Sequence, residues 1–109
     1  MKICIPIKYR WVSPAILSRN IKEAKLFIEI NDKCLFVINL TCAIADVEEL
    51  KNIVKTIDTD EKRITMNITR PRLMENQEEV VIKMIDKIFY INTRRMEIYI
   101  DAEYLKQIF

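Results

Sequence analysis

The 109-residue chain contains no glycine. Glycine is the usual residue wherever the backbone takes a positive φ, so tight turns must here be built from other residues, with Asn and Asp the next best. The same absence excludes the glycine-rich phosphate loop, the dinucleotide-binding fingerprint and the nucleophile elbow of the serine hydrolases. Short hairpins are therefore expected at Asn and Asp pairs, and several large enzyme classes are excluded.

Histidine is absent as well, which removes the commonest general base and the commonest transition-metal ligand. No catalytic residue, cofactor or metal site is predicted. The cysteines Cys4, Cys34 and Cys42 are odd in number and no two have the C-x-x-C spacing. They support neither a disulfide framework nor a zinc site, and are interpreted as small apolar residues that fill space.

Half of the residues are apolar and the net charge is only +2. This composition predicts a single globular domain over residues 1–109. No apolar run approaches the roughly 20 residues that span a bilayer, and the N-terminus lacks the pattern of a secretory signal. We expect no membrane partner and a cytoplasmic, intracellular location. Many Lys and Glu with few Gln fit a heat-adapted protein, and the small size fits an accessory protein of a virus or mobile element.

The spacing of apolar residues predicts strands and helices in alternation. Strands are expected at Ile3–Ile7, Leu26–Ile30, Lys33–Leu40, Lys62–Arg70 and Arg94–Ile100. Cap signals start helices at Ser13, Asp46, Asn76 and Asp101, and the first three run to about Ala24, Ile57 and Phe89. Between the second and third strands, Asn31-Asp32 predicts a two-residue hairpin turn with positive φ.

This order of elements, β-α-β-β-α-β followed by α-β-α, predicts the α+β class. We expect a ferredoxin-like arrangement, in which a mixed, mostly antiparallel five-stranded sheet has its helices packed on one face. The RNA-recognition motif has the same order. Its base-stacking aromatic positions are absent from K-C-L-F-V-I-N-L at Lys33–Leu40, so that resemblance is rejected.

Without a catalytic motif, the sequence favours a small non-enzymatic binding or regulatory module that docks on other proteins and associates with itself. The final helix is too short to be stable alone and must pack on its own core or on a dimer mate. The interface residues predicted for a homodimer or for docking on a protein partner are Glu97, Tyr99, Ile108 and Phe109.

The alternative is nucleic-acid binding by clustered cations with aromatic side chains for stacking. The candidate residues are Lys8, Tyr9, Arg10, Trp11, Lys62, Arg63, Arg70, Arg72, Arg94 and Arg95. This hypothesis requires the basic segments to converge on one face. The low net charge opposes it, and Trp11 has a simpler interpretation as a half-buried anchor of its loop.

A third hypothesis is a hydrolase that works without histidine or metal. Glu97, Tyr99 and Asp101 alternate along one strand and share a face, and paired carboxylates can divide the roles of acid and base. An exposed sheet face must also be polar somewhere, so the pattern alone is weak. A closed pocket lined by these three residues would separate the two interpretations.

Overall fold

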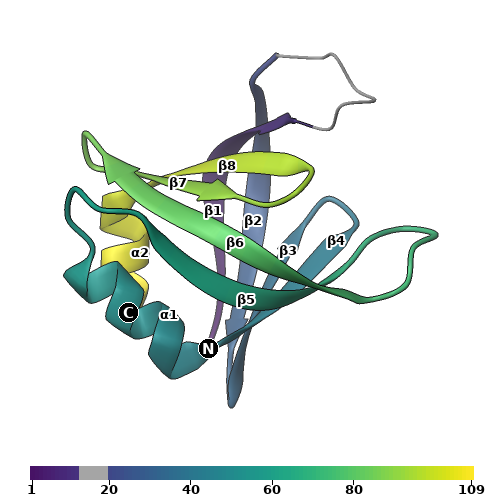
Figure 1. The fold of residues 1–109 in the computed structure, drawn as a ribbon, viewed down its shortest axis with the longest axis horizontal. Helices are drawn as coiled ribbons and strands as arrows, with labels where there is room; N and C mark the ends of the chain where they lie inside the picture. Colours follow the sequence, from purple (N-terminus) through teal and green to yellow (C-terminus); the bar gives the residue numbers. More distant parts are fainter. Residues whose placement is uncertain (13–19) are drawn as a thin grey trace.

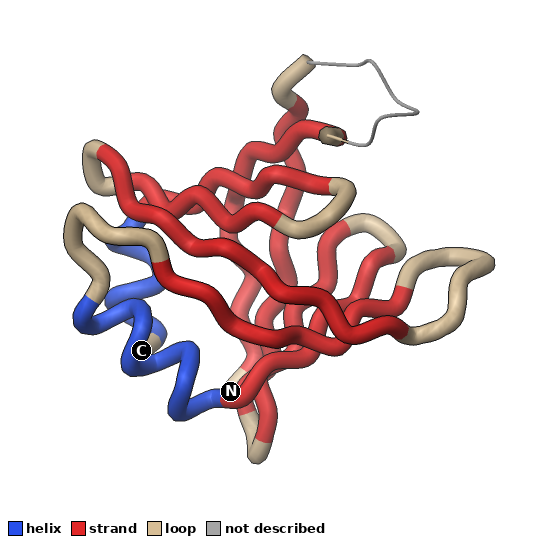
Figure 2. The backbone as a smooth tube through the Cα atoms, viewed as in Figure 1, coloured by secondary structure: helices blue, strands red, loops and turns tan. Residues whose placement is uncertain are grey.

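The computed structural model describes residues 1–12 and 20–109. Eight antiparallel strands form a closed barrel in which each strand pairs with the next and the last returns to the first (Figure 1, Figure 2). The elements are β1 (Lys2–Trp11), β2 (Lys22–Ile30), β3 (Lys33–Ile38), β4 (Thr41–Asp46), α1 (Val47–Thr56), β5 (Lys62–Thr69), β6 (Asn76–Ile85), β7 (Ile88–Asn92), β8 (Met96–Asp101) and α2 (Ala102–Ile108).

The barrel contradicts the predicted α+β, ferredoxin-like sheet with helices on one face. The main cause is the segment Asn76–Phe89, which was expected to be a helix and instead forms β6, a turn and the start of β7. Consecutive apolar residues in V-V-I-K-M-I fit a helical stripe and an alternating strand equally well, so the period alone could not separate them. The turn at Asp86 and Lys87 takes positive φ at both residues, 51° and 64°.

Two other predictions also differ from the structure. The helix expected from Ser13 to Ala24 lies partly outside the described residues, and its last residues belong to β2. The strand expected over Lys33–Leu40 ends at Ile38, where Asn39 takes a φ of 53° and the chain reverses into β4. No separate signal marks β4 in the sequence, because a continuous apolar run hides a tight turn when glycine is absent.

The hairpin at Asn31-Asp32 is confirmed, but its predicted turn conformation is wrong. β2 and β3 pair antiparallel with Ile30 opposite Cys34, which leaves three residues between the paired positions. Neither Asn31 nor Asp32 has a positive φ. The loop therefore closes without the positive φ that a two-residue type I′ or II′ turn requires.

The core fills the barrel with alternate residues of every strand. Inward positions such as Ile64, Met66 and Ile68 on β5 are buried, as are Met96, Ile98 and Ile100 on β8. The two helices begin at the expected caps, where the side chains of Asp46 and Asp101 accept backbone hydrogen bonds at 2.9 and 3.0 Å. α1 and α2 contribute Leu50, Val54 and Leu105 to the same core.

Successive strands run in opposite directions, so the connections between them alternate between the two ends of the barrel. The "helical end" carries both helices and the β2–β3 and β6–β7 turns. The "open end" carries the β1–β2, β3–β4, β5–β6 and β7–β8 connections (Figure 1). The segments K-Y-R-W, R-P-R and R-R all lie at the open end. Lys62 and Arg63 begin β5 at the helical end.

Candidate functional site at the open end of the barrel

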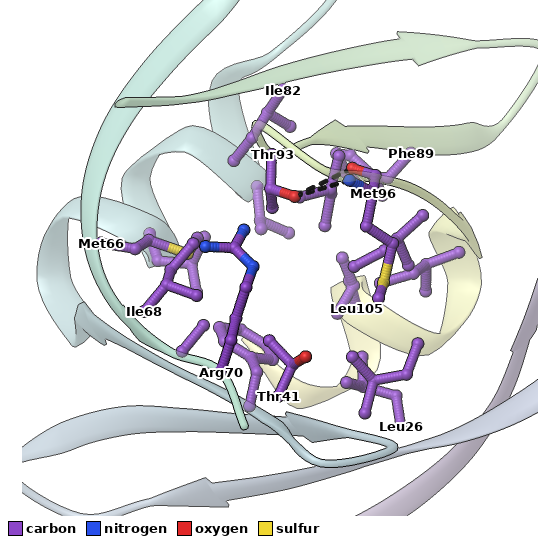
Figure 3. Close-up of a pocket in the computed structure, with 18 residues that line it drawn as sticks. Leu26, Thr41, Met66, Ile68, Arg70, Ile82, Phe89, Thr93, Met96 and Leu105 are labelled. Atoms are coloured by element: carbon purple, nitrogen blue, oxygen red, sulfur yellow. Dashed lines mark hydrogen bonds between the residues drawn. The ribbon is translucent and has the colours of Figure 1, made fainter. Parts of the chain in front are cut away.

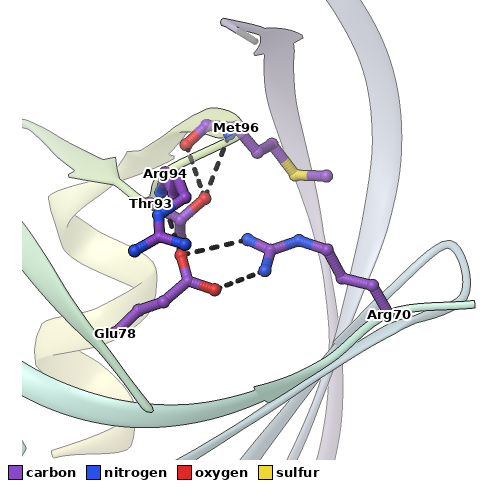
Figure 4. A network of polar contacts seen from close by, with 5 residues as sticks. All are labelled: Arg70, Glu78, Thr93, Arg94 and Met96. Atoms are coloured by element: carbon purple, nitrogen blue, oxygen red, sulfur yellow. Dashed lines mark hydrogen bonds and ion pairs between the residues drawn. The ribbon is translucent and has the colours of Figure 1, made fainter. Parts of the chain in front are cut away.

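A buried ion pair lies inside the open end. Arg70 follows the last residue of β5 and forms a two-pronged ion pair with Glu78 of β6, in which one N···O distance is 3.2 Å. The two side chains are only 11 % and 2 % exposed. The backbone N–H of Arg94 donates to the same carboxylate at 3.1 Å (Figure 4). One carboxylate therefore ties the β5–β6 loop to the β7–β8 loop.

The charge state of Glu78 follows from these contacts. Burial by itself raises the pKa of a carboxyl group. Here the hydrogen bonds from Arg70 and from the Arg94 N–H, with the positive charges of both arginines, outweigh burial and hold the pKa of Glu78 below its ordinary value. Glu78 is therefore ionised at neutral pH, and the pair with Arg70 carries no net charge.

The four connections at the open end carry exposed apolar and basic side chains. We call them the rim, and they comprise Val12, Ile21, Leu40, Arg72, Leu73, Met74, Arg94 and Arg95. Met74 is 90 % exposed and Leu40 is 78 % exposed. Exposed apolar side chains that gather on one surface are typical of interaction sites. The rim thus combines exposed apolar and cationic groups at one end of the barrel.

Hydrogen bonds from the barrel hold the rim loops. Asn39 Nδ2 donates to the hydroxyl of Tyr9 at 3.0 Å, which ties the β3–β4 turn to β1. The N–H of Val12 donates to the carbonyl of Arg95 at 3.0 Å. At the β7–β8 turn, the Thr93 hydroxyl bonds both the N–H and the carbonyl of Met96 at 3.0 Å. Loops held in this way lose little conformational freedom when they bind a partner.

The basic segments proposed for nucleic-acid binding reach the same end of the barrel, but their side chains diverge. Tyr9 is buried inside and meets Trp11 edge to face at 5.9 Å, and Trp11 packs against the core. Arg10 lies on the outer face, where its Nε donates to Glu97 at 3.1 Å. Lys8 is exposed on that face, opposite Tyr99.

Two of the predicted nucleic-acid residues lie away from this end. Lys62 pairs with Asp60 at 2.9 Å, and Arg63 pairs with Glu61 and Glu79. Only Arg72, Arg94 and Arg95 of the predicted set are both exposed and at the rim.

The predicted interface residues separate into two groups. Glu97 and Tyr99 lie half-buried on the outer face of β8, where Tyr99 donates a hydrogen bond to Glu97 and meets Tyr90 edge to face at 5.2 Å. Burial, followed by that hydrogen bond and the charge of Glu97, raises the pKa of Tyr99 to about 12. Ile108 and Phe109 pack against the barrel core from α2.

A groove on the outer face bears on the hydrolase hypothesis. It has a volume of about 610 Å³ and is lined by Tyr99 and Asp101, together with Pro6, Lys8 and other residues of β1 and β2, but not by Glu97. The carboxylate of Glu97 is already engaged by Arg10 and Tyr99. The three residues thus do not line one closed pocket.

Residues 1–12 and 20–109 contain no group of three or more cysteine, aspartate or glutamate side chains arranged to hold a metal ion. In the same residues, no helix has the length and apolar character needed to cross a membrane.

Sequence reasoning missed Glu78, Leu40, Leu73 and Met74. A signal for Glu78 was present, because Glu78, Val80 and Ile82 share one parity. Interpreted as a strand, this segment places the carboxylate of Glu78 on the same face as the buried side chains of Val80 and Ile82. The sequence carries no comparable signal for the rim residues Leu40, Leu73 and Met74. Until the turns are located, an apolar residue in a loop cannot be distinguished from an apolar residue of the core.

Comparison with known proteins gives no family, relative or structural neighbour for this chain. No family model matches it. No curated protein and no solved structure is significantly similar to it.

Proposed function

We propose that the protein is a non-enzymatic binding module that docks, through the rim, on an acidic and partly apolar surface of another protein. The observation that carries the proposal is the gathering of exposed Leu40, Leu73 and Met74 with Arg72 and Arg95 at one end of a closed barrel. Apolar anchors beside arginine are typical of protein interfaces.

The chemistry of the partner follows from the charges. The β5–β6 and β7–β8 connections offer three exposed arginines, Arg72, Arg94 and Arg95, against one acid, Glu75. Charge complementarity therefore favours an acidic partner. The apolar rim residues would be covered by apolar groups between those acids.

The arrangement favours a protein over a nucleic acid. Single strands bind on exposed aromatic faces beside cations. In this protein Tyr9 is buried and Trp11 packs against the core, while Arg10 and Arg70 are paired with Glu97 and Glu78. Exposed leucine and methionine provide no flat ring for a base.

The first step of the test is identification of the partner by photo-crosslinking from position 74 in the source cell. The identified protein is then purified and titrated by calorimetry with three proteins. These are the wild type, a rim variant with Leu40→Ser and Met74→Ser, and a control variant with Ile85→Ser and Tyr104→Ser. The control removes two exposed apolar side chains, 49 % and 39 % exposed, that lie at the helical end.

We expect the rim variant to raise the dissociation constant about tenfold to a hundredfold, as loss of two interface anchors does. The control variant should change it by less than about twofold. Arg72→Glu with Arg95→Glu should slow association and reduce its dependence on salt. Equal losses in the rim and control variants would contradict the proposal. So would rim-dependent, salt-sensitive binding of a 20-nucleotide single strand, which would favour the nucleic-acid alternative.

Homodimer formation and a cytoplasmic location stay predictions. The docking proposal needs neither, because the rim is complete within one chain.

A further inference from the structure

An internal cavity of about 50 Å³ lies inside the barrel (Figure 3). Its walls are apolar side chains from most strands and from both helices, among them Phe36, Met66, Phe89 and Leu105. Three polar residues also line it, Arg70, Thr41 and Thr93, and all three occupy positions at the open-end limits of their strands. The cavity is thus apolar along its length and polar at one end.

Small side chains on one strand leave this space. β4 points Thr41, Ala43 and Ala45 inward, whereas the neighbouring β3 points Phe36 and Ile38 inward. Ala43 lines the cavity. Met66 and Met96 line it too, and methionine is the apolar side chain that adapts most readily to a guest. The walls can therefore rearrange without exposing the core.

The polar end selects the charge of a guest. Arg70 and Glu78 neutralise each other, so an ion of either sign would be left without a counter-charge in an apolar interior. A guanidinium group carries five N–H donors, and two hydrogen bonds to Glu78 use two of them. The polar end therefore offers further donors to a guest that can accept a hydrogen bond.

We propose that this cavity is a binding site for a small uncharged organic molecule with an apolar body and one acceptor oxygen, such as a ketone, ether or ester. The apolar body lies between Ala43 and the methionines, and the oxygen faces Arg70. The volume is about a third of the ~150 Å³ of a dry cavity that accepts benzene, which limits the guest to about three to five non-hydrogen atoms. The site is separate from the rim and does not depend on the docking proposal.

The test uses two defined probes, xenon and 2-butanone, and the protein labelled at methionine and isoleucine methyl groups. Xenon reports the apolar space alone, whereas 2-butanone reports the space and the acceptor oxygen. We expect saturable shifts of the Met66 and Ile68 methyl signals with both probes. No saturable shift with either probe would overturn the proposal.

Two matched substitutions locate the bound probe. Ala43→Val adds two carbons inside the cavity, and Thr69→Val places the same residue on the exposed face of β5, in exchange for a threonine of nearly equal volume. We expect Ala43→Val to weaken both probes at least about tenfold and Thr69→Val to leave them unchanged. Equal affinity in the two variants would place the probes elsewhere and overturn the proposal. If Ala43→Val fails to fold, Ala43→Cys replaces it with the same expected direction.

The polar end has its own readout. Replacing the pair together, Arg70→Met with Glu78→Leu, leaves no buried unpaired charge. This variant should bind 2-butanone about tenfold more weakly, while xenon affinity changes by less than about threefold. If both probes keep their affinity in this variant, the acceptor oxygen is not recognised and the proposed class of ligand is wrong.

Discussion

At the scale of single residues, the pairing of Arg70 with Glu78 has the largest expected energetic effect. Both side chains are nearly removed from water. Removing one partner of such a pair leaves a buried uncompensated charge, at a typical cost of about 3–5 kcal/mol. We expect Glu78→Gln to lower the free energy of unfolding by roughly that amount in urea denaturation. The double change Arg70→Met with Glu78→Leu should cost less than either single change, and an additive double loss would contradict this account.

The same carboxylate predicts a dependence of stability on pH. The pKa of Glu78 is lower in the folded protein than its ordinary value of about 4.3. The unfolded chain therefore binds the proton more readily, and the contribution of Glu78 is fully present above about pH 4.3–5. It is lost as the pH falls through the lowered pKa of the folded state. Urea midpoints between pH 7 and pH 3 should fall more steeply in the wild type than in the Arg70→Met, Glu78→Leu variant. Parallel curves would assign the acid loss to other groups.

The three thiols should differ widely in reactivity. Cys34 is fully buried, and burial raises the pKa of its thiol to about 12, whereas Cys4 is exposed and Cys42 is half-buried. Because the thiolate is the reactive form, Cys34 should react with iodoacetamide at pH 8 at least about a thousandfold more slowly than Cys4. Peptide mass spectrometry over time measures the rates. Similar rates for Cys4 and Cys34 in the folded protein would show that the barrel opens readily. In urea all three should react alike.

At the scale of elements, the turns show what the absence of glycine costs. Asp86 and Lys87 both take positive φ between β6 and β7, the geometry that Asn-Gly fits best in a two-residue hairpin. We expect Asp86→Asn with Lys87→Gly to raise the free energy of unfolding by about 0.5–1 kcal/mol. The matched control is Asp32→Gly, at a turn without positive φ. Glycine there should destabilise by a similar amount, and a gain at both turns would contradict the explanation.

How far the sequence predicts each element depends on whether its signal is local. The caps Asp46 and Asp101 and the strand expected over Lys62–Arg70, which the structure shows over Lys62–Thr69, are predictable because capping and strict alternation need only neighbouring residues. The segment that forms β6 and β7 was mistaken for a helix, because its apolar residues fit both periods. The barrel itself depends on the pairing of β1 with β8, at opposite ends of the chain, and no local pattern encodes that contact.

The candidate site illustrates the same limit. The basic segments were recognised from composition, and the topology does bring K-Y-R-W, R-P-R and R-R to one end of the barrel. Which of their side chains face outward depends on strand parity. Arg10 has its partner, Glu97, 87 residues away in the sequence. Arg70 is paired with Glu78 on the next strand, β6, which the sequence predicts as a helix. The sequence could therefore indicate where the rim lies, but not which of its side chains are exposed.

At the scale of the whole molecule, the closure of the barrel between β1 and β8 leaves part of β1 unpaired on one side. β1 pairs with β2 from Lys2 to Tyr9 but with β8 only from Lys8 to Trp11. The N-terminal amine of Met1 donates to the carbonyl of Ile30, and the N–H of Ile30 donates to the carbonyl of Met1. Since neighbouring residues of an antiparallel strand bond to opposite sides, the N–H groups of Lys2 and Cys4 face the β8 side, where no described strand pairs with them. A free edge of this kind can pair with another strand.

The sequence places a homodimer interface at Glu97, Tyr99, Ile108 and Phe109. From the structure we expect a homodimer at this edge instead, by pairing of β1 with β1 of a second chain. The edge is short, so association should be weak, with a dissociation constant of about tens of micromolar or higher. Light scattering over a concentration series measures it.

Cys4→Pro removes the free N–H and should keep the protein monomeric. Cys4→Ser retains that N–H and should associate like the wild type. A thermal unfolding curve first confirms that Cys4→Pro folds, for which Pro6 on the same face of β1 is a precedent. If the proline variant associates as strongly as the wild type, the interface lies elsewhere. If the wild type stays monomeric at millimolar concentration, the homodimer prediction is wrong.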